Sequence, residues 1–231
     1  SDVCSSDLHG GQGTLVTGVH ENVDIPGSTY VIFGGGVAAT NAANVALGLN
    51  AKVIIIELND DRIKCLEDMY AEKDVTVVKS TPENLAEQIK KADVFISTIL
   101  IPGAKPPKLV TREMVKSMKK GSVLIDIAID QGGTIETIRP TTISDPVYEE
   151  EGVIHYGVPN QPGAVPRTST MALAQGNIDY ILEICDKGLE QAIKDNEALS
   201  TGVNIYQGQV TNQGLATSHD LDYKEILNVI E

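Results

Sequence analysis

Short apolar runs alternate with helix-like patterns along the chain from residue 29 onward. These runs are rich in valine and isoleucine and do not alternate strictly with polar residues, which is typical of strands buried on both faces. The predicted strands are residues 29–33, 52–56, 76–78, 94–97, 122–126 and 153–156, and the predicted crossover helices are residues 37–49, 61–70, 82–90 and 111–119. The pattern predicts an α/β fold with a doubly wound parallel sheet.

The pattern changes after Val158. A loop with prolines at positions 159, 162 and 166 leads to Thr168 or Ser169, either of which is predicted to cap a long helix. The apolar positions of that helix share one face, and they are Ile178, Ile181, Leu182, Cys185, Leu189 and Ile193. Residues 196–231 are predicted as turns and short helices that cannot form a core alone. The apolar face therefore indicates a missing domain or a subunit contact.

Composition narrows the classes of function. Lys and Arg total 18 against 32 Asp and Glu, a net charge of −14, which repels phosphate backbones and anionic lipid. No apolar run approaches the roughly 18 residues that would span a bilayer. The three cysteines, Cys4, Cys65 and Cys185, show neither metal-ligand nor disulfide spacing. We therefore expect no nucleic acid, no membrane, no metal, and free thiols in a reducing cytoplasm.

A glycine-rich turn stands between the first predicted strand and the first helix. Its sequence, Gly-Gly-Gly-Val-Ala-Ala at residues 34–39, fits G-x-G-x-x-A. The glycines allow a sharp turn and let backbone N–H groups approach a pyrophosphate at the helix N-terminus. The candidate contacts are Gly34, Gly36, Val37 and Ala38. A purely structural turn is the alternative, since this motif is weak by itself.

An acidic residue ends the second predicted strand. Glu57 lies 23 positions after Gly34, where a carboxylate can accept hydrogen bonds from both ribose hydroxyls of an adenosine. The glycine turn, its place between a strand and a helix, and the acidic residue together predict a Rossmann domain that binds NAD. The carboxylate disfavours NADP because it repels the 2′-phosphate. Arg62 is a candidate contact at the adenosine end, with a solvated helix charge as the alternative.

Further ligand contacts are expected where the remaining strands end. The candidates there are Ser80 after the third strand, Ile99 and Leu100 after the fourth, and Asp130 after the fifth. For Asp130 the alternative is an Asx turn ahead of Gly132 and Gly133.

Three uncommon segments follow the glycine turn in order, and they resemble the alanine dehydrogenase family, which includes the NAD(P) transhydrogenase alpha subunit. They are residues 101–110 (IPGAKPPKLV), residues 128–133 (AIDQGG) with Arg139-Pro140-Thr141-Thr142, and residues 162–170 (PGAVPRTST). The resemblance runs from about His9 to Asn204.

The resemblance implies an NAD-dependent oxidoreductase that converts L-alanine, NAD and water to pyruvate, ammonia and NADH, as a homo-oligomer that is commonly a hexamer. It implies that Asp130 is the catalytic aspartate. It also implies cofactor contacts from Glu57, Arg62, Ser80, Ile99, Leu100, Ile127, Ala128, Ile129, Asp130, Val158, Pro159, Asn160 and Gln161.

The chain departs from the family at its start. Family members open with a substrate domain that supplies a catalytic histidine, a lysine and an arginine, so an N-terminally truncated and inactive chain is expected. No motif supports His9, His20, His155 or His219 as a substitute for the histidine. The expected division is an N-terminal remnant and lead-in (1–20), the Rossmann domain (21–164) and a C-terminal helical part of a mostly missing substrate domain (165–231).

Two other functions remain open at this point. One is the NAD-binding component of a proton-translocating transhydrogenase, which shares the fold and a similar Pro-Lys-Leu loop, although the AIDQGG segment fits alanine dehydrogenase better. The other is a non-catalytic NAD-binding module.

Overall fold

The apolar strands predicted from the sequence assemble into a seven-stranded sheet in the order β3-β2-β1-β4-β5-β7-β6, of which the first six pair in parallel. The strands are β1 (Thr29–Phe33), β2 (Lys52–Glu57), β3 (Val75–Lys79), β4 (Val94–Ser97), β5 (Val123–Asp126), β6 (Val147–Glu150) and β7 (Val153–Tyr156). The prediction of a doubly wound, largely parallel sheet is confirmed.

The computed structural model describes residues 11–20, 23–101 and 104–230. The chain divides into two units, unit 1 with residues 1–100 and 106–159, and unit 2 with residues 101–105 and 160–231. His9, Pro102 and Gly103, which belong to the segments that carry the family resemblance, lie outside the described residues.

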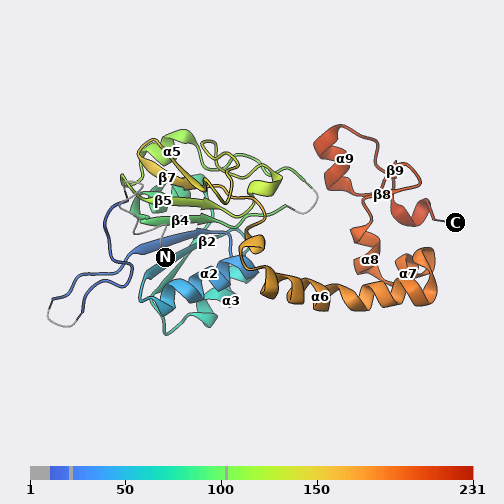
Figure 1. The fold of residues 1–231 in the computed structure, drawn as a ribbon, viewed down its shortest axis with the longest axis horizontal. Helices are drawn as coiled ribbons and strands as arrows, with labels where there is room; N and C mark the ends of the chain where they lie inside the picture. The colour runs from blue at the N-terminus through green and yellow to red at the C-terminus, as the bar shows by residue number, and fades with distance from the viewer. Residues whose placement is uncertain (1–10, 21–22, 102–103, 231) are drawn as a thin grey trace. The chain divides into compact units, whose positions relative to one another are not determined.

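Helices cover both faces of the sheet in unit 1 (Figure 1). The helices are α2 (Val37–Gly48), α3 (Asp60–Met69), α4 (Pro82–Gln88) and α5 (Arg112–Lys116), with 3₁₀ turns η2 (Ile89–Lys91) and η3 (Ile129–Gln131). On one face, Ile32 and Ile55 pack with Ala39 of α2 and Leu66 of α3. The opposite face packs against α4 and α5. Apolar side chains on both faces explain why the strands lack strict alternation.

Strand β6 was not predicted, and it is the one antiparallel strand of the sheet. Its sequence, Val-Tyr-Glu-Glu, is polar because it forms the sheet edge, where Glu149 is exposed. A tight turn with Glu151 and Gly152 at positive φ joins it to β7. Such an edge strand has no continuous apolar run, so the sequence pattern does not reveal it.

Unit 2 contains η4 (Gln161–Ala164), α6 (Pro166–Lys187), α7 (Leu189–Asp195), α8 (Glu197–Gly202), β8 (Ile205–Tyr206), β9 (Gln209–Val210), α9 (Gln213–His219) and η5 (Ile226–Asn228). The predicted caps of the long helix were wrong. The helix begins at Pro166 with Val165 as N-cap, since proline at the first helical position has no N–H to leave unpaired. Thr168 and Ser169 therefore lie inside the helix, and the Ser169 hydroxyl donates to the Pro162 carbonyl at 2.8 Å.

The predicted single long helix is interrupted at Gly188, where φ is 79° and ψ is 157°. Leu189 and Ile193 consequently belong to α7 rather than to the helix that carries Ile178 and Ile181. Ile193 is buried with Ile226 and Ile230 in a small core of unit 2. The tail thus contributes to a core only together with α7.

Candidate functional site

The point where the order of strands reverses lies between β1 and β4. From β1 the chain passes through α2 to β2 and then to β3, before it returns to β4 on the other side of β1. Because these strands are parallel, their carboxyl ends share one edge, and open α/β sheets bind ligands there. The glycine turn and the segments after β2, β3, β4 and β5 all leave the sheet at this edge.

The glycine turn after β1 is shaped by its surroundings. Gly34 has φ of 102°, which favours glycine, and a Cβ there would lie 2.6 Å from the Thr98 Oγ1. Gly36 is the N-cap of α2, and a Cβ there would meet no atom within 4 Å. Val37, which is exposed, and Ala38 form the first helical turn. The open side of Gly36 and the free amides of the helix start suit a pyrophosphate.

Glu57 at the end of β2 is held by backbone amides. Its Oε1 accepts hydrogen bonds from the N–H groups of Leu58 at 2.7 Å and Asn59 at 2.8 Å. Its other oxygen, Oε2, lies beside the glycine turn, since a Cβ on Gly35 would be 2.6 Å from it. The carboxylate is therefore oriented in advance, with Oε2 toward the glycine turn.

Arg62 on α3 contacts the glycine turn directly. Its Nε donates to the Gly35 carbonyl at 2.7 Å, and its backbone N–H donates to the Asn59 side chain that caps α3. Arg62 is half-buried rather than a fully solvated helix charge. The structure therefore brings Glu57, Arg62 and the glycine turn together.

The ends of β3 and β4 complete this edge. The Ser80 N–H donates to the Glu57 carbonyl at 2.7 Å, which places Ser80 beside the end of β2. Ile99 is partly buried against the core, whereas Leu100 is exposed. Thr98, which the sequence pattern did not predict as a contact, donates through Oγ1 to the Phe33 carbonyl at 3.0 Å. Its position could have indicated a contact, because Thr98 is the first residue after the buried strand β4 and has a polar side chain.

The segment after β5 carries Asp130 on η3, where this aspartate is exposed. Ala128 and Ile129 are buried and Ile127 is partly buried, so Asp130 is the exposed residue among residues 127–130. Asp126, which directly precedes the segment, is fully buried.

The last four predicted contacts fall in both units. Val158 is buried and Pro159 is partly buried in unit 1. Asn160, with φ of 49° in the left-handed region, and Gln161 at the start of η4 belong to unit 2.

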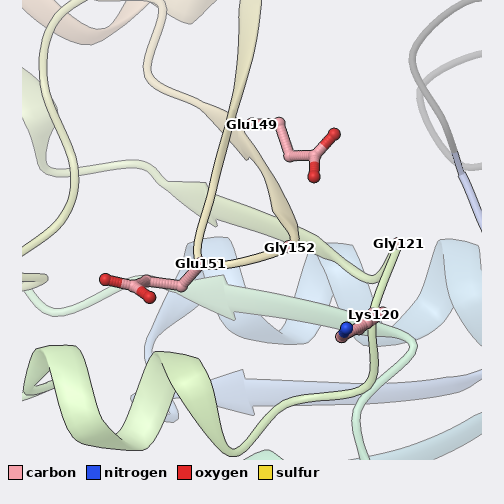
Figure 2. A pocket seen from close by; sticks show the side chains of 5 residues that line it. All are labelled: Lys120, Gly121, Glu149, Glu151 and Gly152. Atoms are coloured by element: carbon pink, nitrogen blue, oxygen red, sulfur yellow. The ribbon is translucent and has the colours of Figure 1, made fainter.

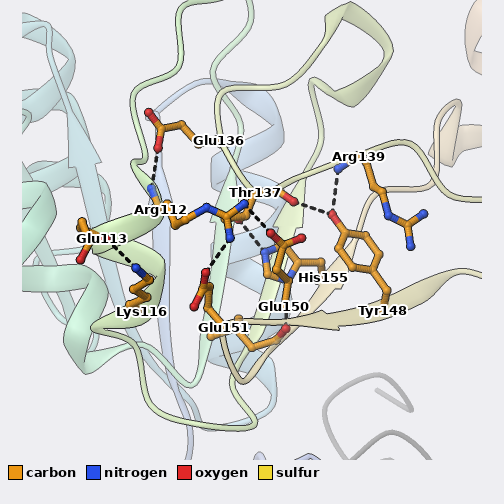
Figure 3. A network of polar contacts seen from close by, with 11 residues as sticks. Arg112, Glu113, Lys116, Glu136, Thr137, Arg139, Tyr148, Glu150, Glu151 and His155 are labelled. Carbon is orange, nitrogen blue, oxygen red and sulfur yellow. Dashed lines mark hydrogen bonds and ion pairs between the residues drawn. The ribbon is translucent and has the colours of Figure 1, made fainter.

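A pocket lies at the opposite edge of the sheet (Figure 2). It is lined by Lys120 and Gly121 before β5, Glu149 of β6, and Glu151 and Gly152 of the β6–β7 turn. Parallel strands begin at this edge, so the pocket does not belong to the glycine-turn site. Nearby, Arg112 forms ion pairs with Glu150 and Glu151, both at 2.5 Å (Figure 3).

His155 on β7 is a fully bonded core residue (Figure 3). Its Nδ1 donates to the Val153 carbonyl at 2.9 Å, so its Nε2 accepts from the Thr137 hydroxyl at 2.7 Å. Burial lowers the pKa of His155 below its usual value, which favours the neutral ring. Tyr148 stacks on it with ring centroids 5.0 Å apart. The geometry makes this histidine structural.

Comparison with known proteins identifies the family. The sequence profile "Alanine dehydrogenase/PNT, C-terminal domain" matches residues 4–213. Alanine dehydrogenase 1 of Staphylococcus aureus strains Mu50 and N315 is 99% identical over 227 residues, which cover 98% of this chain and 61% of the relative. The chain belongs to the alanine dehydrogenase/PNT family.

Solved structures agree with this assignment. An L-alanine dehydrogenase matches with a TM-score of 0.79 and 37% identity, over 91% of this chain and 57% of that one. A transhydrogenase from Sinorhizobium meliloti matches with a TM-score of 0.60 and 28% identity, over 68% of this chain and 46% of that one. The alanine dehydrogenase branch is thus better supported than the transhydrogenase branch. This confirms the predicted family, and membership implies NAD as the cofactor.

This alanine dehydrogenase/PNT chain spans about 61% of the length of those curated relatives. Among residues 11–20, 23–101 and 104–230, no helix is long and apolar enough to cross a bilayer. In the same described ranges, no three His, Cys, Asp or Glu side chains are grouped as metal ligands.

Proposed function

We propose that this chain is the NAD-binding part of an NAD-dependent alanine dehydrogenase. The full-length protein would convert L-alanine, NAD and water to pyruvate, ammonia and NADH. Family membership supports this proposal, and one geometric observation carries it. Glu57 holds one carboxylate oxygen on two backbone amides while the other lies beside the glycine turn. This arrangement suits the ribose hydroxyls of an adenosine whose pyrophosphate lies on the start of α2.

The proposed contacts follow the carboxyl edge of the sheet. Gly34, Gly36, Val37 and Ala38 would hold the pyrophosphate, and Glu57 and Arg62 the adenosine side. The remaining proposed contacts are Ser80, Ile99, Leu100, Ile127, Ala128, Ile129, Asp130, Val158, Pro159, Asn160 and Gln161. The residues fit the cofactor because no protein atom lies within 4 Å of the position that a Cβ on Gly36 would take, which leaves room for a phosphate.

NAD would supply the hydride acceptor for the Cα–H bond of alanine. Asp130 is proposed as the catalytic aspartate, because it is exposed on the loop after β5 at this edge of the sheet. A carboxylate there can hold a ribose hydroxyl and can accept or return a proton during the reaction. The neutral, buried His155 is not available for this role.

The proposal also covers the location of the protein, its oligomeric state and its domains. We expect a cytoplasmic homo-oligomer, commonly a hexamer in this family, acting on L-alanine, pyruvate and ammonia. The proposed division is residues 1–20, residues 21–164 and residues 165–231. Exposed apolar side chains on α6, among them Met171, Leu173 and Ile178, support a partner surface in the C-terminal part.

Calorimetry with NADH and NADPH tests the proposed cofactor site. We expect at least a tenfold preference for NADH, because a lost hydrogen bond to a charged group costs about 1.5–3 kcal/mol and each 1.4 kcal/mol is tenfold. Glu57→Gln should reduce that preference, since the amide no longer repels a 2′-phosphate. Glu67→Gln on the exposed side of α3 is the matched control. Equal affinities of the unchanged chain for both cofactors would contradict the assignment of Glu57.

A further inference from the structure

The loop after β5, residues 127–134, contains two glycines in the left-handed region. Gly132 has φ of 100° and Gly133 has φ of 66°. Consecutive glycines leave a free chain many conformations, so a loop that must present one side chain precisely needs other contacts to define it. Asp130 lies on this loop.

The side chain of Asp126 accepts hydrogen bonds from both ends of the loop. Its Oδ1 accepts from the Ala128 N–H at 2.9 Å, and its Oδ2 accepts from the Thr134 N–H at 2.7 Å and the Thr134 hydroxyl at 3.2 Å. The carboxylate is fully buried, and burial raises its pKa while these bonds and nearby Lys108 oppose the rise. A Cβ on Gly133 would lie 2.8 Å from Oδ2, so the loop packs directly against the carboxylate.

The same cluster reaches the neighbouring strand. Ser97 at the end of β4 and Thr134 are both fully buried, and their hydroxyl oxygens are 2.7 Å apart. Because the Thr134 hydroxyl donates to Asp126, Ser97 donates to Thr134. The ends of β4 and β5 are thereby joined through side chains.

The side chain of Lys108 donates hydrogen bonds to two backbone carbonyls at the end of the loop. Its Nζ donates to the Gly132 carbonyl at 2.7 Å and to the Ile135 carbonyl at 2.9 Å. Beside it, the N–H groups of Leu109 and Val110 donate to the Thr134 carbonyl at 2.7 and 3.1 Å. The Lys108 ammonium thus binds one carbonyl within the glycine pair, that of Gly132, and one directly after the loop, that of Ile135.

We propose that Lys108, with Asp126 and Thr134, is a positioning residue that holds residues 127–134 in the conformation that binds the nicotinamide half of NAD. This inference rests on the proposed function. Glu57 and the glycine turn lie on the β2 side of the strand-order reversal, whereas the loop after β5 lies on the other side. A dinucleotide with its adenosine at Glu57 therefore has its second nucleotide toward β4 and β5.

The test compares NADH with ADP, which lacks both the nicotinamide and its ribose. Lys108→Met removes both charged hydrogen bonds, so the loop must be ordered when the cofactor binds and part of the binding free energy is lost. We expect the affinity for NADH to fall at least about tenfold, as for other lost charged hydrogen bonds, while the affinity for ADP stays within about twofold. Lys108→Arg, which keeps the charge and two donors, should restore most of the affinity for NADH. Lys116→Met, whose Nζ pairs with Glu113 on α5, is the control.

A second pair of variants checks the buried side of the cluster. Thr134→Val keeps the shape but removes the hydroxyl, whereas Thr134→Ser keeps the hydroxyl, so only the valine variant should lower the ratio of NADH affinity to ADP affinity. A general loss of stability would lower both affinities, or the melting temperature, without changing that ratio. An unchanged ratio in Lys108→Met and Thr134→Val, with normal NADH binding by the unchanged chain, overturns the positioning role alone. Failure of the unchanged chain to bind NADH overturns the proposed function and this inference with it.

Discussion

Gly35 and Gly36 are neighbours in the turn after β1, yet they face different surroundings. A Cβ on Gly35 would lie 2.6 Å from the Glu57 Oε2 and 2.8 Å from the Leu66 Cδ1. A Cβ on Gly36 would meet nothing within 4 Å. A methyl group at the first position therefore displaces protein atoms, whereas at the second it occupies only the space proposed for the pyrophosphate.

Gly36→Ala should separate binding from folding. We expect the affinity for NADH to fall at least about tenfold, since a methyl group blocks close approach to the backbone amides. Unfolding free energy should change by less than about 1 kcal/mol, the usual difference between glycine and alanine at an N-cap. Calorimetry and thermal melting measure the two quantities. Gly48→Ala, also in open space at the far end of α2, is the matched control and should leave NADH binding unchanged.

Gly35→Ala should affect both quantities, because Glu57 must leave its place beside the turn. We expect weaker NADH binding together with a lower melting temperature, measured as for Gly36→Ala. A Gly35→Ala chain that binds NADH normally would show that the orientation of Glu57 does not matter for the cofactor.

Asp130→Asn tests the proposed catalytic aspartate in a full-length relative that contains this segment. The substitution keeps the size of the side chain but removes its charge and its capacity to accept a proton. Alanine turnover should fall by about 10²–10⁴-fold, the usual contribution of a general acid or base. NADH affinity should fall much less, because the glycine turn and Glu57 are unchanged. If the aspartate only caps a turn, the melting temperature would fall while turnover stays nearly normal.

At the scale of elements, the β6–β7 hairpin depends on a buried imidazole. His155 on β7 is stacked by Tyr148 of β6 and bonded to Thr137 and Val153. Burial is the largest influence and lowers its pKa; the hydrogen bond to the Val153 carbonyl and the charge of Glu150 raise it, and Arg112 and Arg139 lower it. The unfolded chain consequently binds a proton at a higher pH than the folded chain does.

Stability should therefore fall as the pH drops below about 6.5, the ordinary pKa of histidine, toward the lower pKa of the folded state. One proton limits this slope to about 1.4 kcal/mol per pH unit. The measurement is the unfolding free energy between pH 7 and pH 5, for the unchanged chain and for His155→Gln, which cannot titrate. Parallel pH curves for the two proteins would show that His155 does not carry this dependence.

At the scale of the whole molecule, the chain presents an apolar helix surface. On α6, Leu173, Ile181 and Leu182 are each more than half exposed, at 66%, 53% and 52%. Burying a leucine or isoleucine contributes about 1.5–3 kcal/mol, so leaving several exposed is costly unless another surface covers them. The curated relatives are longer than this chain, which is consistent with such a surface.

We expect that the 231-residue chain alone does not turn over L-alanine, since the family resemblance implies a catalytic histidine, a lysine and an arginine that no motif of this sequence matches. Positioning of reactants accounts for about 7–11 kcal/mol of a barrier, so half a pocket should give no measurable rate. The measurement is NADH formation followed by its absorbance, with a full-length relative as positive control. Clear NADH formation by the short chain would show that the substrate site lies elsewhere.

Local patterns in the sequence determined most of unit 1. Strands covered on both faces have continuous apolar runs, and a glycine turn needs residues of a particular kind at fixed positions, so β1 to β5, β7 and the motif at residues 34–39 were predictable. The family resemblance was equally readable, because its segments are uncommon and keep their order. The contacts proposed for the cofactor remain predictions.

Tertiary structure decided what depends on partners distant in the chain. Strand β6 is polar because it lies at an edge, and the break at Gly188 places Ile193 against Ile226 and Ile230, which no local period reveals. Likewise, Lys108 meets the carbonyls of Gly132 and Ile135 only because the ends of β4 and β5 lie side by side. A sequence pattern records the environment of each residue averaged over its neighbours in the chain, whereas hydrogen bonds between separate loops depend on how the sheet brings those loops together.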